Sequence, residues 1–197
     1  MLRGIANIPL KWNISKFHGG ISMKTTYIDK LGRIVIPNEI RRVLRIQEGE
    51  PLAISLDNEN RIVIRKYSPL RELNDFAEQV CDSAFTATGR LAAICDLNSV
   101  IAASAWAHGI LADLAIDDEF TAIMEDADIY QHSNGKRVYL TRSNPTFHVV
   151  LAVPILSAGN VIGYVASISD VAGATWNDTD VHLALMAAEL IQFKLED

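Results

Sequence analysis

The segment 29–44, with the sequence DKLGRIVIPNEIRRVL, constrains the fold more than any other part of the chain. Its β-branched run at 34–36 favours a buried strand, and Pro37 ends that strand because proline has a fixed φ and no backbone N–H. The same proline suits the first turn of a helix, where Glu39 complements the helix dipole and arginines follow at the far end. A strand and a helix of this size cannot bury enough surface to fold alone. The sequence therefore predicts a module that a second copy of the chain completes.

Charge is distributed unevenly along the chain. The formal net charge of −6 would by itself argue against binding to nucleic acid. Residues 23–67, however, carry nine Lys and Arg against six Asp and Glu, whereas residues 68–197 carry six against eighteen. Because the acidic C-terminal part repels phosphate, any DNA must be bound by the basic N-terminal part.

Residues 31–42, LGRIVIPNEIRR, resemble the recurrent core of the AbrB family of bacterial transition-state regulators. The resemblance continues through residues 44–56 and 62–69. In that family the DNA-binding domain is a swapped-hairpin β-barrel, an obligate dimer in which two chains interleave their hairpins and bring their arginines to one face. The resemblance implies binding to double-stranded DNA, with affinity mainly from phosphate contacts and selectivity partly from DNA shape.

The resemblance assigns a DNA-contacting role to three residues: Arg33, Arg41 and Arg42. Two lysines join this set for their charge and proximity alone: Lys30 and Lys24. Many family members carry a basic pair where this chain has Thr26 and Tyr27, so two phosphate contacts per subunit are lost and a shallower salt dependence is expected. The two hydroxyl groups can still donate to phosphate. A solvated helix end whose arginines pair with nearby glutamates is the weaker alternative.

Local patterns predict the elements of the first domain, 23–67. We expect strands at 24–29, 33–36, 52–57 and 61–66, and a short helix at 37–44. The last two strands alternate apolar and polar residues around the turn-prone 57–60, so they form a hairpin.

Residues 1–22 precede the family match and do not resemble a targeting signal. Gly19 and Gly20 would be encoded by a purine-rich tract suited to ribosome binding, two codons before Met23. We therefore expect translation to start at Met23. The alternative is a flexible, mildly basic arm that adds non-specific affinity for phosphate.

The pattern changes after Pro69. Apolar residues at three- and four-residue spacing predict a coupling helix at 70–86 that packs either on a partner or on its own domain. Apolar runs then predict strands at 91–96, 100–104, 138–142, 148–156 and 161–169, and a final helix at 178–195. The last two of these strands form a hairpin around 157–160. This order of elements resembles a GAF domain.

Together the two parts predict a two-domain α+β or α/β protein. Its parts are a swapped-hairpin β-barrel dimer, a coupling helix at 68–86 and a GAF-like domain at 87–197, with an antiparallel sheet and flanking helices. From Met23 onward, this combination resembles the stage V sporulation protein T family of transcription factors from endospore-forming bacteria.

The chain lacks the patterns that catalysis or metal binding requires. Cys81 and Cys95 are not spaced as C-x-x-C, so we interpret them as buried thiols of a protein in a reducing cytoplasm. The acidic groups at 117–119 and 125–128 break the EF-hand pattern, and the histidines lack zinc-binding spacing. We expect no catalytic residue, metal or cofactor. No membrane association is expected, because no apolar run approaches about 20 residues.

Two functions fit these observations. The first is a regulator of sporulation genes, nucleoid-associated in the forespore cytoplasm, that forms tetramers through its GAF domains and the helices 70–86 and 178–195. Its GAF domain either senses an unknown small molecule or serves only oligomerisation. The second is an antitoxin-like protein whose C-terminal body binds a protein partner. Antitoxin tails are usually extended when free, whereas this body has the apolar strands of a folded domain, so the regulator is preferred.

Overall fold

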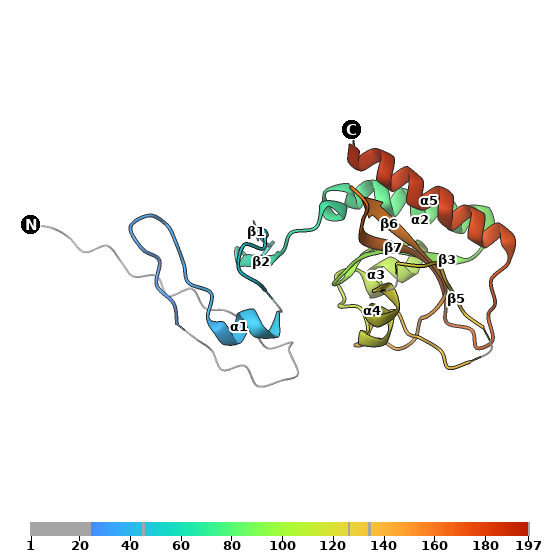
Figure 1. The fold of residues 1–197 in the computed structure, drawn as a ribbon, viewed down its shortest axis with the longest axis horizontal. Helices are drawn as coiled ribbons and strands as arrows, with labels where there is room; N and C mark the ends of the chain where they lie inside the picture. Colours follow the sequence, from blue (N-terminus) through green and yellow to red (C-terminus); the bar gives the residue numbers. More distant parts are fainter. Residues whose placement is uncertain (1–24, 45, 126, 134, 197) are drawn as a thin grey trace, which may run out of the picture. The chain divides into compact units, whose positions relative to one another are not determined.

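The computed structural model describes residues 25–44, 46–125, 127–133 and 135–196 (Figure 1). The predicted extension 1–22, the predicted start at Met23 and the candidate contact Lys24 lie outside these residues. The chain divides into two compact units between Tyr67 and Ser68. None of the helices in the described ranges is both long and apolar enough to cross a membrane.

The N-terminal unit contains one short helix and one hairpin. Helix α1 spans Asn38–Val43, strand β1 spans Leu52–Leu56 and strand β2 spans Ile62–Lys66. The two strands pair antiparallel with Ile54 opposite Ile64, which confirms the predicted hairpin. Pro37 stands immediately before α1, with the φ of −57° that the first turn of a helix requires.

The two strands predicted at 24–29 and 33–36 are wrong as secondary structure over the described residues 25–36. These residues form two extended arms joined by a turn, with Asp29 N donating to Arg33 O at 3.0 Å and Thr26 Oγ1 donating to Val35 O at 3.1 Å. A strand requires a ladder of backbone hydrogen bonds to a neighbour. Among the described residues 25–36 the backbone-to-backbone hydrogen bonds lie within the turn at 29–33, so no ladder forms.

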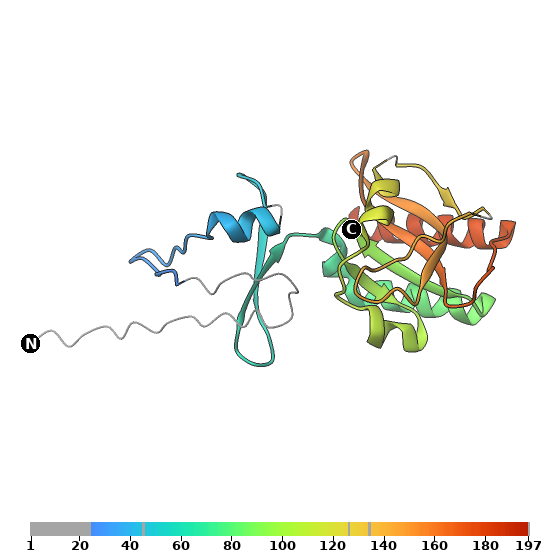
Figure 2. The ribbon, with the colours of Figure 1, turned by 90° about the horizontal axis from the view of Figure 1, so that it is seen from below.

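The C-terminal unit is an antiparallel sheet with helices on both faces (Figures 1 and 2). Its strands lie in the order β4-β3-β7-β6-β5, and every neighbouring pair is antiparallel. Their bounds are Leu91–Asp96 (β3), Val100–Ala103 (β4), Tyr130–Gln131 (β5), His148–Ser157 (β6) and Asn160–Ser169 (β7). The helices are α2 (Asn74–Thr88), α3 (His108–Leu111), α4 (Asp118–Met124) and α5 (Asp178–Glu196), with short 3₁₀ helices η1 (Pro69–Leu73) and η2 (Ala105–Ala107). The antiparallel sheet with flanking helices confirms the architecture predicted for this unit.

One predicted strand of this unit is wrong. Residues 138–142 form only isolated bridges, Tyr139 with His148 and Thr141 with Ile116. The two bridges join the segment to different neighbours, so it does not extend along one strand. Conversely, the short strand β5 was not predicted, because two residues are too few to show a period.

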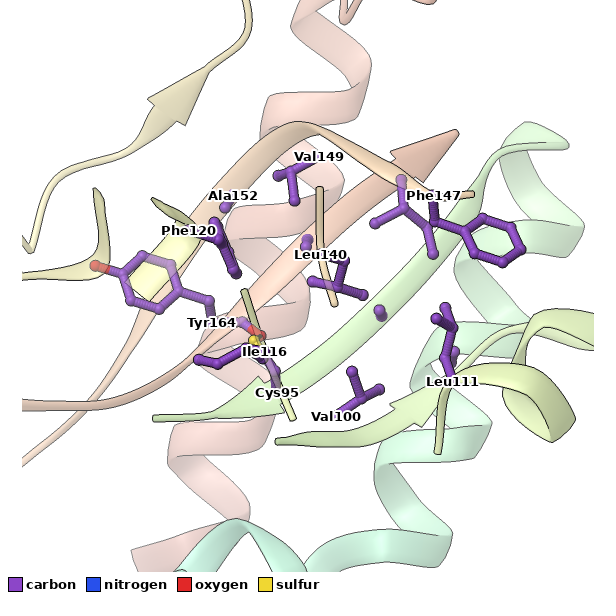
Figure 3. Close-up of a cluster of buried hydrophobic side chains, with 14 of the residues drawn as sticks. Cys95, Val100, Leu111, Ile116, Phe120, Leu140, Phe147, Val149, Ala152 and Tyr164 are labelled. Atoms are coloured by element: carbon purple, nitrogen blue, oxygen red, sulfur yellow. Dashed lines mark hydrogen bonds between the residues drawn. The ribbon is translucent and has the colours of Figure 1, made fainter. Parts of the chain in front are cut away.

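Separate apolar clusters fill the two faces of the sheet. On one face α3, α4 and the segment 138–147 cover a cluster that includes Phe120, Leu140, Phe147 and Tyr164, all fully buried (Figure 3). On the other face α2 lies against β3 and β4, and α5 lies against β6 and β7. Both helices therefore belong to the core of their own unit. The predicted coupling helix packs on its own sheet, and it begins with η1 before α2 starts at Asn74.

Candidate DNA interface

The turn at 29–33 is organised by the carboxylate of Asp29. Its Oδ1 accepts hydrogen bonds from the backbone N–H groups of Leu31 at 2.8 Å and Arg33 at 2.9 Å, and its Oδ2 accepts from Arg33 Nε at 2.7 Å. Gly32 has a φ of +79°, which permits the chain to reverse here. The backbone and side-chain donors of Arg33 lower the pKa of Asp29. The turn thus presents Arg33, whose side chain is 73% exposed, on an ordered support.

The other candidate contacts are exposed on the same stretch of chain. Lys30 lies within the turn, and Arg41 and Arg42 lie in the last turn of α1, where positive charge is favoured by the helix dipole. The Arg41 guanidinium donates to the side chain of Asn38. Glu39 stands in the first turn of α1, as predicted.

The two residues that replace the family's basic pair have different surroundings. The Thr26 hydroxyl donates to Val35 O and so links the two arms of the turn. Tyr27 is 70% exposed, and its side chain is free to meet a partner molecule. Of these two hydroxyl groups, the tyrosine is therefore the better placed to donate to phosphate.

A second turn repeats the first one closely. Asp57 Oδ1 accepts from the backbone N–H groups of Glu59 and Arg61, both at 2.9 Å, and Asp57 Oδ2 accepts from Arg61 Nε at 2.5 Å. Asn60, with a φ of +57°, takes the place of Gly32. The common pattern is Asp-x-x-(Gly or Asn)-Arg. Sequence reasoning missed the repeat, although the pattern is visible at both positions.

The N-terminal unit has no core of its own among its described residues. None of residues 25–44 and 46–67 is buried. Its exposed large apolar side chains are Tyr27, Ile28, Leu31, Val35, Val43, Leu44, Ile54, Leu56 and Tyr67. Such a surface is unusual for a monomer and typical of a chain whose core is shared with a partner.

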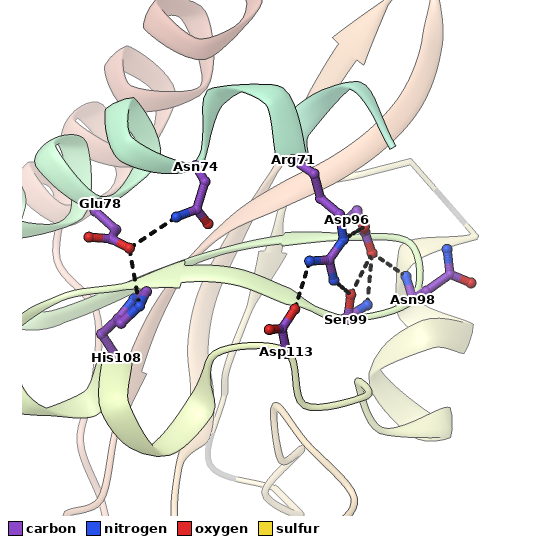
Figure 4. A network of polar contacts seen from close by, with 8 residues as sticks. All are labelled: Arg71, Asn74, Glu78, Asp96, Asn98, Ser99, His108 and Asp113. Atoms are coloured by element: carbon purple, nitrogen blue, oxygen red, sulfur yellow. Dashed lines mark hydrogen bonds and ion pairs between the residues drawn. The ribbon is translucent and has the colours of Figure 1, made fainter. Parts of the chain in front are cut away.

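A polar network holds the beginning of the C-terminal unit to its sheet (Figure 4). Arg71 donates to Asp113 Oδ1 at 2.7 Å and to Ser99 Oγ at 2.6 Å, and its Nε lies 3.7 Å from Asp96 Oδ2. Asp96 is buried, and its other oxygen accepts from the backbone N–H groups of Asn98 and Ser99. The polar side chains of this network therefore have a structural role.

The acidic residues at the start of α4 also have structural partners. Asp117 caps the helix by accepting from Glu119 N at 2.9 Å, Asp118 pairs with Arg142, and Glu119 pairs with Lys136 at 2.7 Å. Across the described ranges no three His, Cys, Asp or Glu side chains are grouped to hold a metal ion. Burial raises the pKa of both thiols, Cys81 and Cys95. Neither is therefore suited to act as a nucleophile at neutral pH.

His148 is a buried titratable residue at the start of β6. It is 1% exposed, its Nε2 has no hydrogen-bond partner within the described residues, and the ring of His132 lies 6.1 Å away. Burial, then the charges of Arg137 and His132, lower the pKa of His148 below its usual 6.5.

We expect the C-terminal unit to lose stability in mild acid because of His148. A lowered folded pKa means that the neutral ring stabilises the fold fully above the unfolded value near 6.5. That contribution is lost as the pH falls from there towards the folded pKa. Urea unfolding at pH 7.5 and 5.5 should show a smaller pH dependence for His148→Leu than for the wild type. The exposed His182→Gln serves as the control, and an unchanged dependence in His148→Leu would contradict the assignment.

A small cavity lies between α2, α5 and the strands β3 and β7. Its volume is about 30 Å³, and Thr88, Arg90, Ser167 and Asp180 supply its polar lining. Arg90 Nε lies 3.2 Å from Asp180 Oδ1, so the two charges are paired. The volume is enough for about one or two water molecules, not for a metabolite.

Comparison with known proteins decides the family. Residues 72–196 match the family described as "Stage V sporulation protein T C-terminal, transcription factor". Stage V sporulation protein T of Bacillus subtilis (strain 168) is 36% identical over 143 residues, which cover 72% of this chain and 80% of that protein. The chain belongs to the stage V sporulation protein T family. It is a DNA-binding transcription regulator of the sporulation type, as the sequence predicted.

Further matches concern each unit separately. Residues 27–72 match the family "Antidote-toxin recognition MazE, bacterial antitoxin". Transition state regulatory protein AbrB of Bacillus subtilis (strain 168) is 41% identical over 64 residues, 32% of this chain and 66% of that protein. This likeness supports DNA binding and oligomerisation by the N-terminal unit. Because the sporulation family covers the C-terminal unit, the antitoxin alternative is not favoured.

Two solved structures show weaker likeness. A type II free methionine-R-sulfoxide reductase from Thermoplasma acidophilum has a TM-score of 0.46 at 17% identity, covering 64% of this chain and 94% of that chain. The cofactor-binding GAF domain of the nutrient sensor CodY from Clostridium difficile has a TM-score of 0.44 at 12% identity, covering 80% and 93%.

Proposed function

We propose that this protein binds double-stranded DNA through Arg33, Arg41 and Arg42, assisted by Lys30 and Lys24, and regulates forespore genes. In this proposal residues 23–67 bind DNA, 68–86 couple the units and 87–197 serve assembly. The protein would act in the cytoplasm on the nucleoid. The observation that carries the proposal is the ordered Asp29 turn, which presents an exposed arginine, together with the exposed basic end of α1. Phosphate contacts by such side chains supply most of the affinity in DNA-binding proteins.

Arg33 is expected to contribute far more to DNA affinity than Arg61, its counterpart in the second turn. Arg33→Ala should weaken binding about tenfold or more, as loss of a groove contact does. Arg61→Ala is a matched control, because Arg61 occupies the same kind of turn but is paired with two carboxylates, Asp57 and Glu59. Fluorescence anisotropy with genomic fragments from an endospore-former, across a range of salt, measures both variants. Equal losses for the two would contradict the proposed interface.

The N-terminal unit would act as an obligate dimer. The support is the absence of buried residues in its described part and the exposure of Ile54 and Leu56 on one side of β1. Two chains that interleave would bury these side chains and supply the ladder that the arms at 25–36 need. The symmetry would also double the number of arginines that face the DNA.

Assembly into a tetramer would use the outer side of α5. Met186, Leu190 and Phe193 are 51%, 43% and 66% exposed and follow a four-three spacing, with the half-buried Leu183 continuing the row. This is the seam that a second amphipathic helix packs against. The opposite side of α5 includes Ala184, Ala188 and Ile191 in the core of its unit.

A charged side chain in the exposed apolar row of α5 should dissociate the proposed tetramer into dimers. Phe193→Glu is expected to convert tetramers to dimers, because a carboxylate cannot be buried between apolar helices without a partner. Val171→Glu is the matched control, since Val171 is similarly exposed at 63% but lies outside the helices. Sedimentation velocity measures the masses. A tetramer that persists in Phe193→Glu would place the contact elsewhere.

We favour an assembly role over metabolite sensing for the GAF-like unit. Fully buried Phe120, Phe147 and Tyr164 occupy one face of its sheet, and Tyr164 OH donates to Met124 O at 2.8 Å. A small-molecule ligand on this face would have to displace these side chains. Thermal shift assays with a metabolite library test the choice. A compound that raises the Tm in a concentration-dependent manner would establish sensing instead.

A further inference from the structure

The two Asp-x-x-(Gly or Asn)-Arg turns have the same internal hydrogen bonds. In each, the Asp backbone N–H donates to the Arg carbonyl at 3.0 Å, and the Asp carbonyl accepts from the fourth residue at 3.0 Å. In each, one carboxylate oxygen accepts two backbone N–H groups and the other accepts Arg Nε. The turns therefore position an arginine by the same mechanism, and they differ only in what surrounds it.

The surroundings leave one arginine available and neutralise the other. Arg61 Nη1 lies 2.7 Å from Glu59 Oε2, so both Asp57 and Glu59 engage its guanidinium. The corresponding place in the first turn holds Leu31, and the preceding residue is Lys30. Within the described residues, hydrogen bonds to the Arg33 guanidinium involve Nε alone. Its Nη1 and Nη2 groups therefore remain a pair of donors that Asp29 does not engage.

We propose that Asp29 is a positioning residue that makes Arg33 read guanine. By holding Nε, the carboxylate fixes the plane of the guanidinium before DNA arrives and leaves its two terminal donors for guanine O6 and N7 in the major groove. Bidentate recognition of this kind requires a planar, pre-oriented fork, whereas phosphate binding requires only positive charge. This inference rests on the proposed DNA contact of Arg33. To that contact it adds the base that is recognised, guanine, and the residue that sets the specificity, Asp29.

The proposal predicts that Asp29→Asn affects affinity for random DNA and discrimination for guanine in different ways. Asp29→Asn retains an oxygen that can accept the N–H groups of Leu31 and Arg33, but it lacks the charged acceptor for Arg33 Nε. It also removes a negative charge next to DNA. Binding to a random duplex should therefore stay constant or become tighter, while discrimination for guanine is lost. A merely structural role for Asp29 would lower both.

The experiment uses the full chain and two duplexes. One is a sequence selected by the wild type from a random pool, and the other is the same duplex with 7-deazaguanine, which lacks the N7 acceptor. The wild type should bind the modified duplex about tenfold more weakly. Asp29→Asn should bind the two alike, and so should Arg33→Lys, which keeps the charge without the fork. Asp57→Asn, the matched control, should retain the wild-type penalty.

Each other result overturns a specific statement. A wild type without a penalty, or an Asp29→Asn protein that keeps it, overturns the positioning role. So does an Asp29→Asn protein that loses affinity equally for both duplexes, which is what a folding defect gives. Failure of the proposed function has a different signature. Arg33→Ala would then bind random and selected duplexes as the wild type does, at every salt concentration.

Discussion

Replacing Gly163 with alanine is expected to lower the stability of the C-terminal unit by about 3 kcal/mol or more. A Cβ at this position would stand 2.1 Å from Cys95 O and 2.5 Å from Leu70 Cδ1. The carbonyl belongs to the interior strand β3, which pairs with the central strand β7 through Asp96 and Gly163, so the backbone cannot move without breaking the sheet. Strands β3 and β7 would have to separate or shift register.

The measurement for Gly163→Ala is chemical unfolding followed by far-UV circular dichroism. Gly109→Ala is the control, because a Cβ there meets nothing within 4 Å and the residue lies in helix α3. Alanine in a helix is favoured over glycine, so this control should be neutral or slightly stabilising. Equal unfolding midpoints for Gly163→Ala and the wild type would show that β3 and β7 do not pack as closely as described.

Replacing Ile54 with aspartate is expected to abolish DNA binding while the C-terminal unit stays folded. Ile54 is 69% exposed in the single chain, so the substitution should cost little within that chain. In the proposed dimer the same side chain is buried, where an unpaired carboxylate is strongly unfavourable. The N-terminal unit would then fail to assemble, and the affinity for DNA should fall about 100-fold or more, because isolated units lack paired contacts.

Sedimentation velocity, DNA anisotropy and thermal unfolding test the Ile54→Asp variant together. Ser55→Asp is the control, because alternate residues of a strand point to opposite faces. It adds the same charge one position away without entering the proposed interface. If Ile54→Asp bound DNA with wild-type affinity, the N-terminal unit would not need the dimer that its exposed apolar surface indicates.

Several elements could be predicted from the sequence because their signals are local. The apolar runs of β3, β6 and β7 and the row of apolar residues on α5 record which faces are buried. The predicted fold class and family are confirmed for the same reason, since the motif at 31–42 and the order of the later strands are properties of the chain itself. The candidate DNA contacts remain predictions, because their roles depend on a molecule outside the chain.

Other features depend on residues that meet only in the folded protein. The sequence does not single out Gly163, because only the pairing of β7 with β3 brings it against the Cys95 carbonyl. The sequence argued against an EF-hand at 117–119, but only the folded structure shows Arg142 paired with Asp118 and Lys136 paired with Glu119. The arms at 25–36 carry strand-forming residues but form no ladder within the described chain, and in the proposed dimer the second chain would supply the missing neighbour. Periodicity determined the elements of this protein, and contacts between distant segments determined which of its polar and small residues are structural. The physical reason is that the local sequence determines which face of a helix or strand each side chain occupies. Tertiary packing determines which side chains from distant segments come into contact.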